Sequence, residues 1–221
     1  FYDLKWQKKN NIAPHTVNST GTWMTVGLPA EVIASLKSEI SKSNYIHIKW
    51  DKGFKEYQRG DYQFGVSLQD KQSLSTLLDK INSDIEGIIY LGSVISSKQK
   101  NFSISAYQKK CAAGLLHLTQ ALVNSVLSPQ LIILTENSVP FENSAVQLDL
   151  SGSLVSGMIK TINIEHPEFN GVHVDVDSLS NENLLHALKL ALNSSNDNTH
   201  EDQLVLRSSE YYVPRMVSKA V

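Results

Sequence analysis

Two hydrophobic patterns alternate through most of the chain. Short, almost continuous apolar runs of strand length are separated by longer stretches in which apolar residues recur every three or four positions, as on one face of a helix. The predicted strands are residues 23–26, 45–50, 87–92, 131–135 and 172–176. The predicted helices are residues 29–42, 70–82, 106–127, 152–163 and 181–192.

The predicted strands at 87–92 and 131–135 are apolar on both faces, which is typical of parallel strands covered by helices on each side. Repeated strand–helix–strand units require right-handed crossovers and therefore produce a parallel sheet between two helical layers. We predict a doubly wound α/β fold of the Rossmann-like type, in one piece. No internal repeat or change of composition indicates a domain boundary.

Both ends of the chain are predicted to be strands. Residues 1–6 precede a polar linker at 7–21, and residues 203–207 and 210–217 form the last two strands. We expect residues 1–6 to pair with residues 210–217, because both segments alternate as half-buried antiparallel strands do. A chain that opens directly in a strand, without an initiator Met, predicts a segment of a longer polypeptide.

Residues 51–66 contain several glycine and aspartate breakers between the second predicted strand and the next helix. We expect an irregular, solvent-facing loop there. We also expect no proper helix before about residue 70, although a full fold of this type would place a crossover helix in this position.

Composition excludes several classes of function. The 221 residues are 41% hydrophobic and 19% charged, with a net charge of −2, so no basic surface for nucleic acid or an anionic membrane is expected. No apolar run is long enough to span a membrane. A single cysteine, Cys111, excludes an internal disulfide and a zinc site with several thiolates, which favours a reducing, cytoplasmic compartment.

The first predicted strand–helix turn is where a dinucleotide would bind in this fold. A phosphate loop needs G-x-G-x-x-G, whereas this turn reads Gly27-Leu28-Pro29-Ala30-Glu31-Val32. Pro29 removes an amide donor, and Glu31 places a negative charge beside the expected phosphates. Asp51 lies about where a ribose-binding acid is expected, but without the glycines it carries little weight.

A short-chain reductase also needs a Tyr-x-x-x-Lys pair on a helix and a nearby serine. The literal match, Tyr45 to Lys49, falls in a predicted strand, where four residues span about 13 Å, and a half-buried strand explains it better. The helix predicted at 152–163, where the pair belongs, contains no tyrosine. We predict that the catalytic residues of a reductase are absent.

The remaining candidates have structural explanations that we prefer. His166, His173 and Asp175 could suggest a metal site, but turn or strand-surface histidines are the simpler interpretation. Cys111 lies on the apolar face of its helix and is predicted to be a packed core thiol rather than a nucleophile.

Two glycosylation acceptor patterns begin at Asn18 and at Asn101, but nothing in the sequence indicates secretion.

Four lysines bracket a loop and a helix start, and they predict either a solvated face or a docking patch for an acidic partner. They are Lys98, Lys100, Lys109 and Lys110.

Several longer segments resemble the ketoreductase region of polyketide synthases. The similarity is carried by residues 114–122, 129–135, 157–168, 171–177, 201–207 and 213–216, together with the opening strand. In that family the first half of the ketoreductase is a truncated, non-catalytic Rossmann-like subdomain. The second half binds NADPH and carries the catalytic Tyr, Ser and Lys. What this sequence contains and lacks matches the first half.

The resemblance implies one structural subdomain over residues 1–221, with strand 1–6, linker 7–21, a Rossmann-like body at 22–207 and strand 210–217. It implies no catalytic, cofactor-binding or metal-binding residue here, with NADPH only in an adjoining catalytic subdomain. That subdomain and other synthase domains are the expected partners in cis, with an acyl carrier protein as a further candidate and a homodimeric parent.

Two alternatives remain open at this point. The segment could be a pseudo-ketoreductase linker beside a dehydratase or methyltransferase, or a divergent NADPH-dependent ketoacyl reductase in its own right. A G-x-G-x-x-G and a Tyr-x-x-x-Lys just after Val221 would indicate a working ketoreductase.

Overall fold

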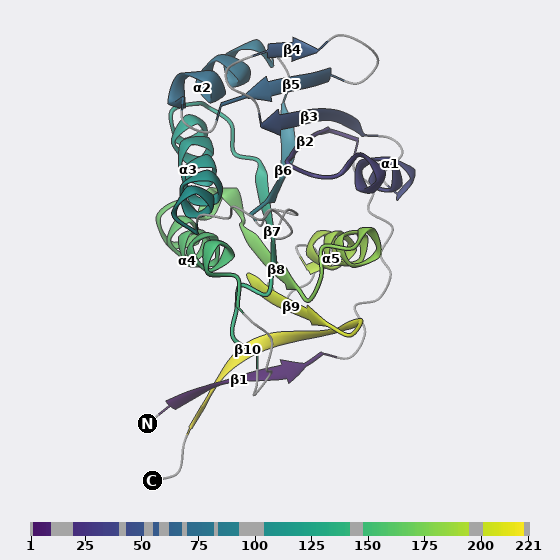
Figure 1. The fold of residues 1–221 in the computed structure, drawn as a ribbon, viewed down its shortest axis with the longest axis vertical. Coiled ribbons are helices and arrows are strands. Elements are labelled where there is room, and N and C mark those ends of the chain that lie inside the picture. The colour runs from purple at the N-terminus through teal and green to yellow at the C-terminus, as the bar shows by residue number, and fades with distance from the viewer. Residues whose placement is uncertain are drawn as a thin grey trace.

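The computed structural model is a mixed sheet with helices on both faces (Figure 1). It describes ten stretches of the chain, and every structural statement below refers to them. They are residues 2–9, 20–39, 43–50, 55–57, 62–67, 70–81, 84–92, 104–141, 148–194 and 201–218.

Seven parallel strands form the body of the sheet. In chain order they are β2 (Thr22–Val26), β3 (Asn44–Trp50), β5 (Tyr62–Val66), β6 (Ile85–Leu91), β7 (Gln130–Glu136), β8 (Val172–Val176) and β9 (Gln203–Arg207). Their order across the sheet is β5-β3-β2-β6-β7-β8-β9. This is the Rossmann strand order extended by one strand. From β2 the chain adds strands first on one side, to β5, and then on the other side, from β6 to β9, so the strand order reverses between β2 and β6 although all seven strands are parallel. The predicted fold class is confirmed.

Helices cover the two faces of the sheet unequally (Figure 1). Helices α2 (Lys71–Lys80), α3 (Ile104–Val123) and α4 (Leu150–Glu165) lie on one face, and a short 3₁₀ turn, Pro167–Phe169, follows α4. Helices α1 (Ala30–Glu39) and α5 (Asn181–Ser194) lie on the other face.

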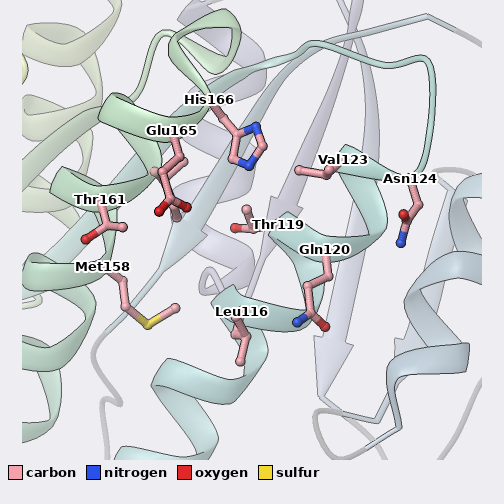
Figure 2. Close-up of a pocket in the computed structure, with 10 residues that line it drawn as sticks. Leu116, Thr119, Gln120, Val123, Asn124, Met158, Thr161, Glu165 and His166 are labelled. Carbon is pink, nitrogen blue, oxygen red and sulfur yellow. The ribbon is translucent and has the colours of Figure 1, made fainter.

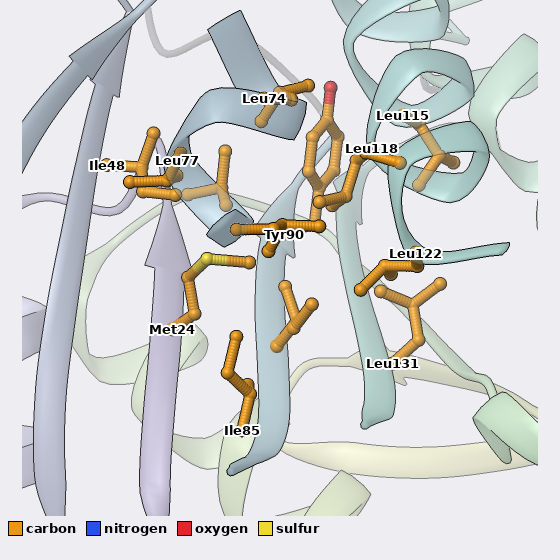
Figure 3. Packing of buried hydrophobic residues seen from close by; sticks show 14 of the residues in the cluster. Met24, Ile48, Leu74, Leu77, Ile85, Tyr90, Leu115, Leu118, Leu122 and Leu131 are labelled. Atoms are coloured by element: carbon orange, nitrogen blue, oxygen red, sulfur yellow. The ribbon is translucent and has the colours of Figure 1, made fainter. Parts of the chain in front are cut away.

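Each face has its own hydrophobic core. Under α2 and α3, Tyr90 of β6 stands between the leucines of the two helices, as Figure 3 shows. Its hydroxyl donates to the carbonyl of Cys111 at 2.7 Å. Burial raises the pKa of Tyr90 well above its ordinary value. Cys111 is itself buried in this core, as predicted.

The stretch expected to be an irregular loop at 51–66 is in part a strand pair, so that prediction is wrong for its described residues. Strand β4 (Lys55–Tyr57) pairs antiparallel with β5, which joins β3 in parallel. Phe64 explains the extra strand, because its buried ring extends the core beneath α2. The described residues between β3 and α2 form strands and no helix.

Strands β10 and β1 extend one edge of the sheet as an antiparallel ribbon. Strand β1 (Tyr2–Lys8) pairs with β10 (Glu210–Ser218), and β10 pairs with β9. The predicted pairing is confirmed, with Leu4 opposite Met216, Lys5 opposite Arg215 and Gln7 opposite Val213. Strand β1 also includes residues 7 and 8, which we had placed in the linker.

Trp6 anchors this ribbon to the loop after β7. Its indole nitrogen donates to the carbonyl of Pro140 at 2.9 Å, and its ring centroid lies 6.0 Å from that of Phe141. Phe141 packs edge-on against Tyr212 at 4.7 Å and lies 5.6 Å from the guanidinium carbon of Arg207. Through Phe141, the ribbon is held against the end of β9.

We predict that Trp6→Ala lowers the free energy of unfolding by about 1–3 kcal/mol, because it removes ring packing and a hydrogen bond. Tyr2→Ala is the matched control, since Tyr2 lies on the same face but is 73% exposed. The control should change stability by no more than about 0.5 kcal/mol. Urea unfolding in dilute protein measures both, and equal losses would show that Trp6 is no anchor.

Candidate functional site

The carboxyl ends of β2 and β6, where the strand order reverses, are the place at which this fold holds a ligand. The turn after β2 is folded onto the protein. Gly27, at a φ of 76°, donates its amide to the carbonyl of Ile48 at 3.1 Å, and Leu28 packs against the core. The carboxylate of Glu31, at the start of α1, accepts a hydrogen bond from the side-chain amide of Asn181. The amide of Gly27 is thus used within the sheet.

The Tyr45 and Lys49 match lies on β3, as the strand interpretation predicted. Tyr45 is buried under α1, where its hydroxyl lies 3.4 Å from the carbonyl of Leu36, and burial raises its pKa to about 12. Lys49 is exposed. His47, between them on the same face, lies 2.8 Å from the hydroxyl of Thr25. Asp51 lies outside the described residues.

Asp175 forms a buried polar cluster at the carboxyl ends of β7, β8 and β9. Its Oδ1 accepts from the hydroxyls of Thr135 and Ser138, each at 2.6 Å, and from the amide of Ser138 at 2.8 Å. Its Oδ2 accepts from Arg207 at 2.5 Å, and Arg207 also donates to the carbonyl of Asp175. The charge of this fully buried carboxylate is therefore paired and hydrogen-bonded.

His173 extends the cluster toward α4. It is fully buried, its Nε2 lies 2.8 Å from the hydroxyl of Thr135, and its Nδ1 lies 3.5 Å from the hydroxyl of Ser156. Burial lowers the pKa of His173 to about 4, so the ring is neutral at pH 7. Because Thr135 donates to Asp175, His173 donates from Nε2 to Thr135.

The cluster corrects our interpretation of these residues. We had expected His173 to lie on a strand surface, but β8 is a central strand with helices on both faces, so alternate residues do not reach solvent. Thr135, Ser138 and Arg207 were missed, because no local spacing connects them with Asp175. In the part of the chain that the structure describes, no group of three or more His, Cys, Asp or Glu residues is placed to hold a metal ion.

The rest of this edge is lined by carboxylates that accept hydrogen bonds from backbone amides. Glu136 accepts from Leu179 at 3.1 Å, and Asp149 accepts from Gly152 at 3.1 Å. Asp177 accepts from the amide of Ser208 at 2.9 Å. Burial, and secondarily the neighbouring aspartates, raise the pKa of Glu136. These amides already have anionic partners within the chain.

The other candidate residues do not join this cluster. His166 follows α4, where its Nδ1 lies 3.1 Å from Glu168 in a turn, as predicted. Lys109 and Lys110 fall within α3, and nothing is described of their side chains. Asn18, Asn101, Lys98 and Lys100 lie outside the described residues. None of the described helices is long and apolar enough to cross a membrane.

An apolar face on α3 and α4 was not anticipated from the sequence. Five large apolar side chains on these two helices are 45% to 82% exposed, and we call the surface that they form the α3–α4 face. They are Leu116 and Val123 of α3, and Leu150, Leu154 and Ile164 of α4. On α4 they recur on the side opposite the buried Val155, Ile159 and Ile162. The sequence signal that could have revealed this face is the occurrence of apolar residues on all sides of α4.

A groove of about 460 Å³ runs between the two helices. Figure 2 shows Leu116 and Met158 at one end of it, with Glu165 and His166 toward the other. A Cβ placed on Gly157, on the outer side of α4, would meet no atom within 4 Å. The face is therefore open to the close approach of another element.

We predict that stability falls as the pH drops from about 6.5 to 4, because the unfolded chain protonates His173 over this range and the folded chain does not. The loss from this residue should be about 3 kcal/mol. In His173→Gln, that part of the pH dependence disappears. Urea unfolding across this pH range measures it, and identical slopes in both proteins would contradict the neutral, buried ring.

Solved structures with a similar fold include synthase ketoreductases and free-standing dehydrogenases. A keto acid-selecting NRPS module with adenylation, ketoreductase and pseudo Asub domains matches with a TM-score of 0.79 at 16% identity, over 99% of this chain and 18% of that chain. A C2-type ketoreductase from a modular polyketide synthase matches with a TM-score of 0.70 at 21% identity, over 100% and 44%. At these identities the likeness establishes the fold.

A putative short-chain alcohol dehydrogenase from Burkholderia multivorans matches with a TM-score of 0.60 at 9% identity, over 86% of this chain and 96% of that one. The chain therefore spans less than half of the synthase structures but nearly the whole dehydrogenase fold. The expected likeness to polyketide synthase ketoreductases is confirmed in the fold. No curated protein matches the chain closely enough to count as a relative.

A family model described as beta-ketoacyl synthase-like, N-terminal, matches residues 23–191, from β2 to the end region of α5. The match covers well over half of the chain. The chain belongs to the beta-ketoacyl synthase-like, N-terminal family.

Proposed function

We propose that this chain is a non-catalytic structural subdomain of a polyketide synthase or related module, and that it braces a catalytic ketoreductase half. The observation that carries the proposal is the exposed α3–α4 face, on a fold whose carboxyl edge is occupied by its own carboxylates. The adjoining half and other synthase domains are its proposed partners in cis, within a cytoplasmic parent.

The α3–α4 face suits a packed protein partner. Contiguous apolar surface on a soluble unit marks a place that another surface covers. Leu150, Leu154, Gly157 and Ile164 follow each other at helical spacing along the outer side of α4. The small Gly157 and the groove beside Met158 would let the ridge of a partner helix approach closely.

The size of the chain supports the same proposal. Four ketoreductases with this fold are more than twice as long, since the chain covers 42% to 45% of them. A second half of comparable length would supply the surface that covers α3 and α4. The pseudo-ketoreductase alternative has the same docking face but a second half without a cofactor site.

Reductase chemistry by this chain alone is disfavoured by the groups at its carboxyl edge. Ser138, in the loop after β7, is 2% exposed, and its hydroxyl donates to Asp175. At the turn after β2, where the phosphates of a nicotinamide cofactor would lie, Pro29 has no amide hydrogen and the amide of Gly27 donates to the carbonyl of Ile48. Helix α4 carries no tyrosine.

We predict that residues 1–221 do not bind NADPH and do not reduce a ketoacyl thioester. Fluorescence titration with NADPH is the measurement, and the parent polypeptide extended past Val221 is the positive control if it contains G-x-G-x-x-G and Tyr-x-x-x-Lys. A micromolar dissociation constant for the 221-residue chain would favour the alternative of a divergent reductase instead.

We predict that Leu154→Glu and Ile164→Glu each weaken association with the separately expressed catalytic half by at least about 30-fold, because each buries a charge in an apolar interface. Lys189→Gln is the control. It changes the charge by the same amount on α5, which covers the opposite face of the sheet.

Isothermal titration calorimetry measures the association. The variants should leave the stability of the chain alone nearly unchanged, because Leu154 and Ile164 are 46% and 82% exposed in it. Wild-type affinity in both variants would refute docking through the α3–α4 face.

A further inference from the structure

Strand β1 presents an edge of the described sheet to solvent. It pairs with β10 on one side and is the terminal strand in the order of the sheet. Six of its seven residues are exposed, and the seventh, Trp6, is partly buried. An exposed strand edge of this length is a template for pairing with another strand.

The register fixes which backbone groups point outward. The amide of Lys9 donates to the carbonyl of Tyr211, so the pair formed by these two residues is a hydrogen-bonded pair of the antiparallel ladder. Such pairs alternate along the ladder, and odd-numbered residues of β1 therefore bond to β10. The amides and carbonyls of Tyr2, Leu4 and Trp6 point away from β10, toward the open edge.

Two charged side chains of β1 have no partner in the described part of the chain. Asp3 and Lys5 are exposed and make no ion pair or hydrogen bond there. The other charges of the ribbon are paired. Lys8 contacts Glu210, while Lys9 and Arg215 both contact Glu201.

We propose that β1 pairs antiparallel with β1 of a second copy of this chain, with Leu4 opposite Leu4. In this register Asp3 of each copy lies opposite Lys5 of the other, and Tyr2 lies opposite Trp6. The order Tyr-Asp-Leu-Lys-Trp is thus complementary to itself when reversed. Two opposite-charge pairs form, one on each side of the symmetry axis.

Only this register satisfies both backbone and charge. A pairing of odd with even residues would set outward-pointing amides against groups already bonded to β10. A register centred on Lys5 opposes two lysines, and one centred on Asp3 opposes two aspartates. A register centred on Trp6 leaves Asp3 beyond the paired stretch.

An apolar row crosses the same junction. Leu4 is 55% exposed and lies opposite Met216 of β10, which is 71% exposed. Cross-strand partners share a face of the sheet, so the proposed pairing places Met216, Leu4, Leu4 of the second copy and its Met216 side by side. The row buries apolar surface that each copy alone leaves in water.

Sedimentation equilibrium of the full 221-residue chain tests this pairing over a wide concentration range. Leu4→Pro removes the amide that bonds across the junction but no bond to β10, because the amide of Leu4 faces outward. We expect the wild type to dimerise and Leu4→Pro to remain monomeric with an unchanged circular dichroism spectrum.

Charge exchange tests the register. Asp3→Lys and Lys5→Asp each convert both cross-copy pairs to like charges and should weaken the dimer about tenfold at low salt. The double variant Asp3→Lys/Lys5→Asp restores opposite charges and should recover wild-type affinity. Lys8→Asp, a similar change outside the paired stretch, should leave the dimer intact.

Three results would overturn the proposal. They are a wild type that stays monomeric, a dimer that survives Leu4→Pro, and a double variant no stronger than the single variants. A dimer that is lost in Ile164→Glu and kept in Leu4→Pro would place the interface on the α3–α4 face. The three results that overturn the pairing of β1 do not bear on NADPH binding or on docking to a catalytic half, so the two proposals fail separately.

Discussion

The carboxylate of Asp175 is buried where β7, β8 and β9 end, and a buried charge is tolerated only when it is paired and fully hydrogen-bonded. Thr135 and Ser138 from the β7 side and Arg207 from β9 meet this requirement together. One side chain therefore links the carboxyl ends of three parallel strands whose backbones already pair in register. Removing Arg207 would leave an uncompensated charge in the core, and removing Thr135 or Ser138 would leave the carboxylate short of a hydrogen bond.

The same interaction reaches the edge of the sheet. Arg207 lies over the ring of Phe141 on one side and holds Asp175 on the other. Phe141 in turn contacts Trp6 and Tyr212. The ribbon of β1 and β10 is therefore oriented by the cluster at the carboxyl ends of the strands, although it lies outside the parallel body of the sheet (Figure 1).

The polar groups at the carboxyl ends of the strands can either bind a cofactor or make hydrogen bonds that stabilise the fold. In a Rossmann-like fold the amides and hydroxyls there are the groups that hold a cofactor. Here Ser138, Gly152, Leu179 and Ser208 donate to carboxylates of the chain itself. A ligand at the ends of β7, β8 and β9 would have to displace these bonds and approach several negative charges. The surface left for recognition is the α3–α4 face, which is apolar and open.

Local pattern in the sequence predicted most of the elements, because strand runs and helical stripes depend on neighbours a few residues apart. It failed where the outcome depends on distant residues. The breakers around Phe64 hid β5, since only the core under α2 makes that strand favourable. His173 was placed on a surface because burial depends on the position of β8 in the sheet.

Two features of the chain near the ligand position of this fold could be predicted from the sequence. The unfavourable turn after β2 and the strand position of Tyr45 can be read from residues close in sequence. The cluster around Asp175 joins residues separated by 32 to 40 positions, so no local motif reveals it. The α3–α4 face escaped notice because helical spacing does not distinguish apolar residues that face the sheet from those that face a partner.

Hydroxyl-radical footprinting, read out by mass spectrometry, tests the central claim most directly. The 221-residue chain alone is compared with the polypeptide that includes the catalytic half. The account predicts lower oxidation of Leu116, Leu154 and Ile164 in the longer polypeptide, with Leu185 of α5 unchanged. Equal oxidation of the α3–α4 face in both proteins would contradict a bracing role for this chain.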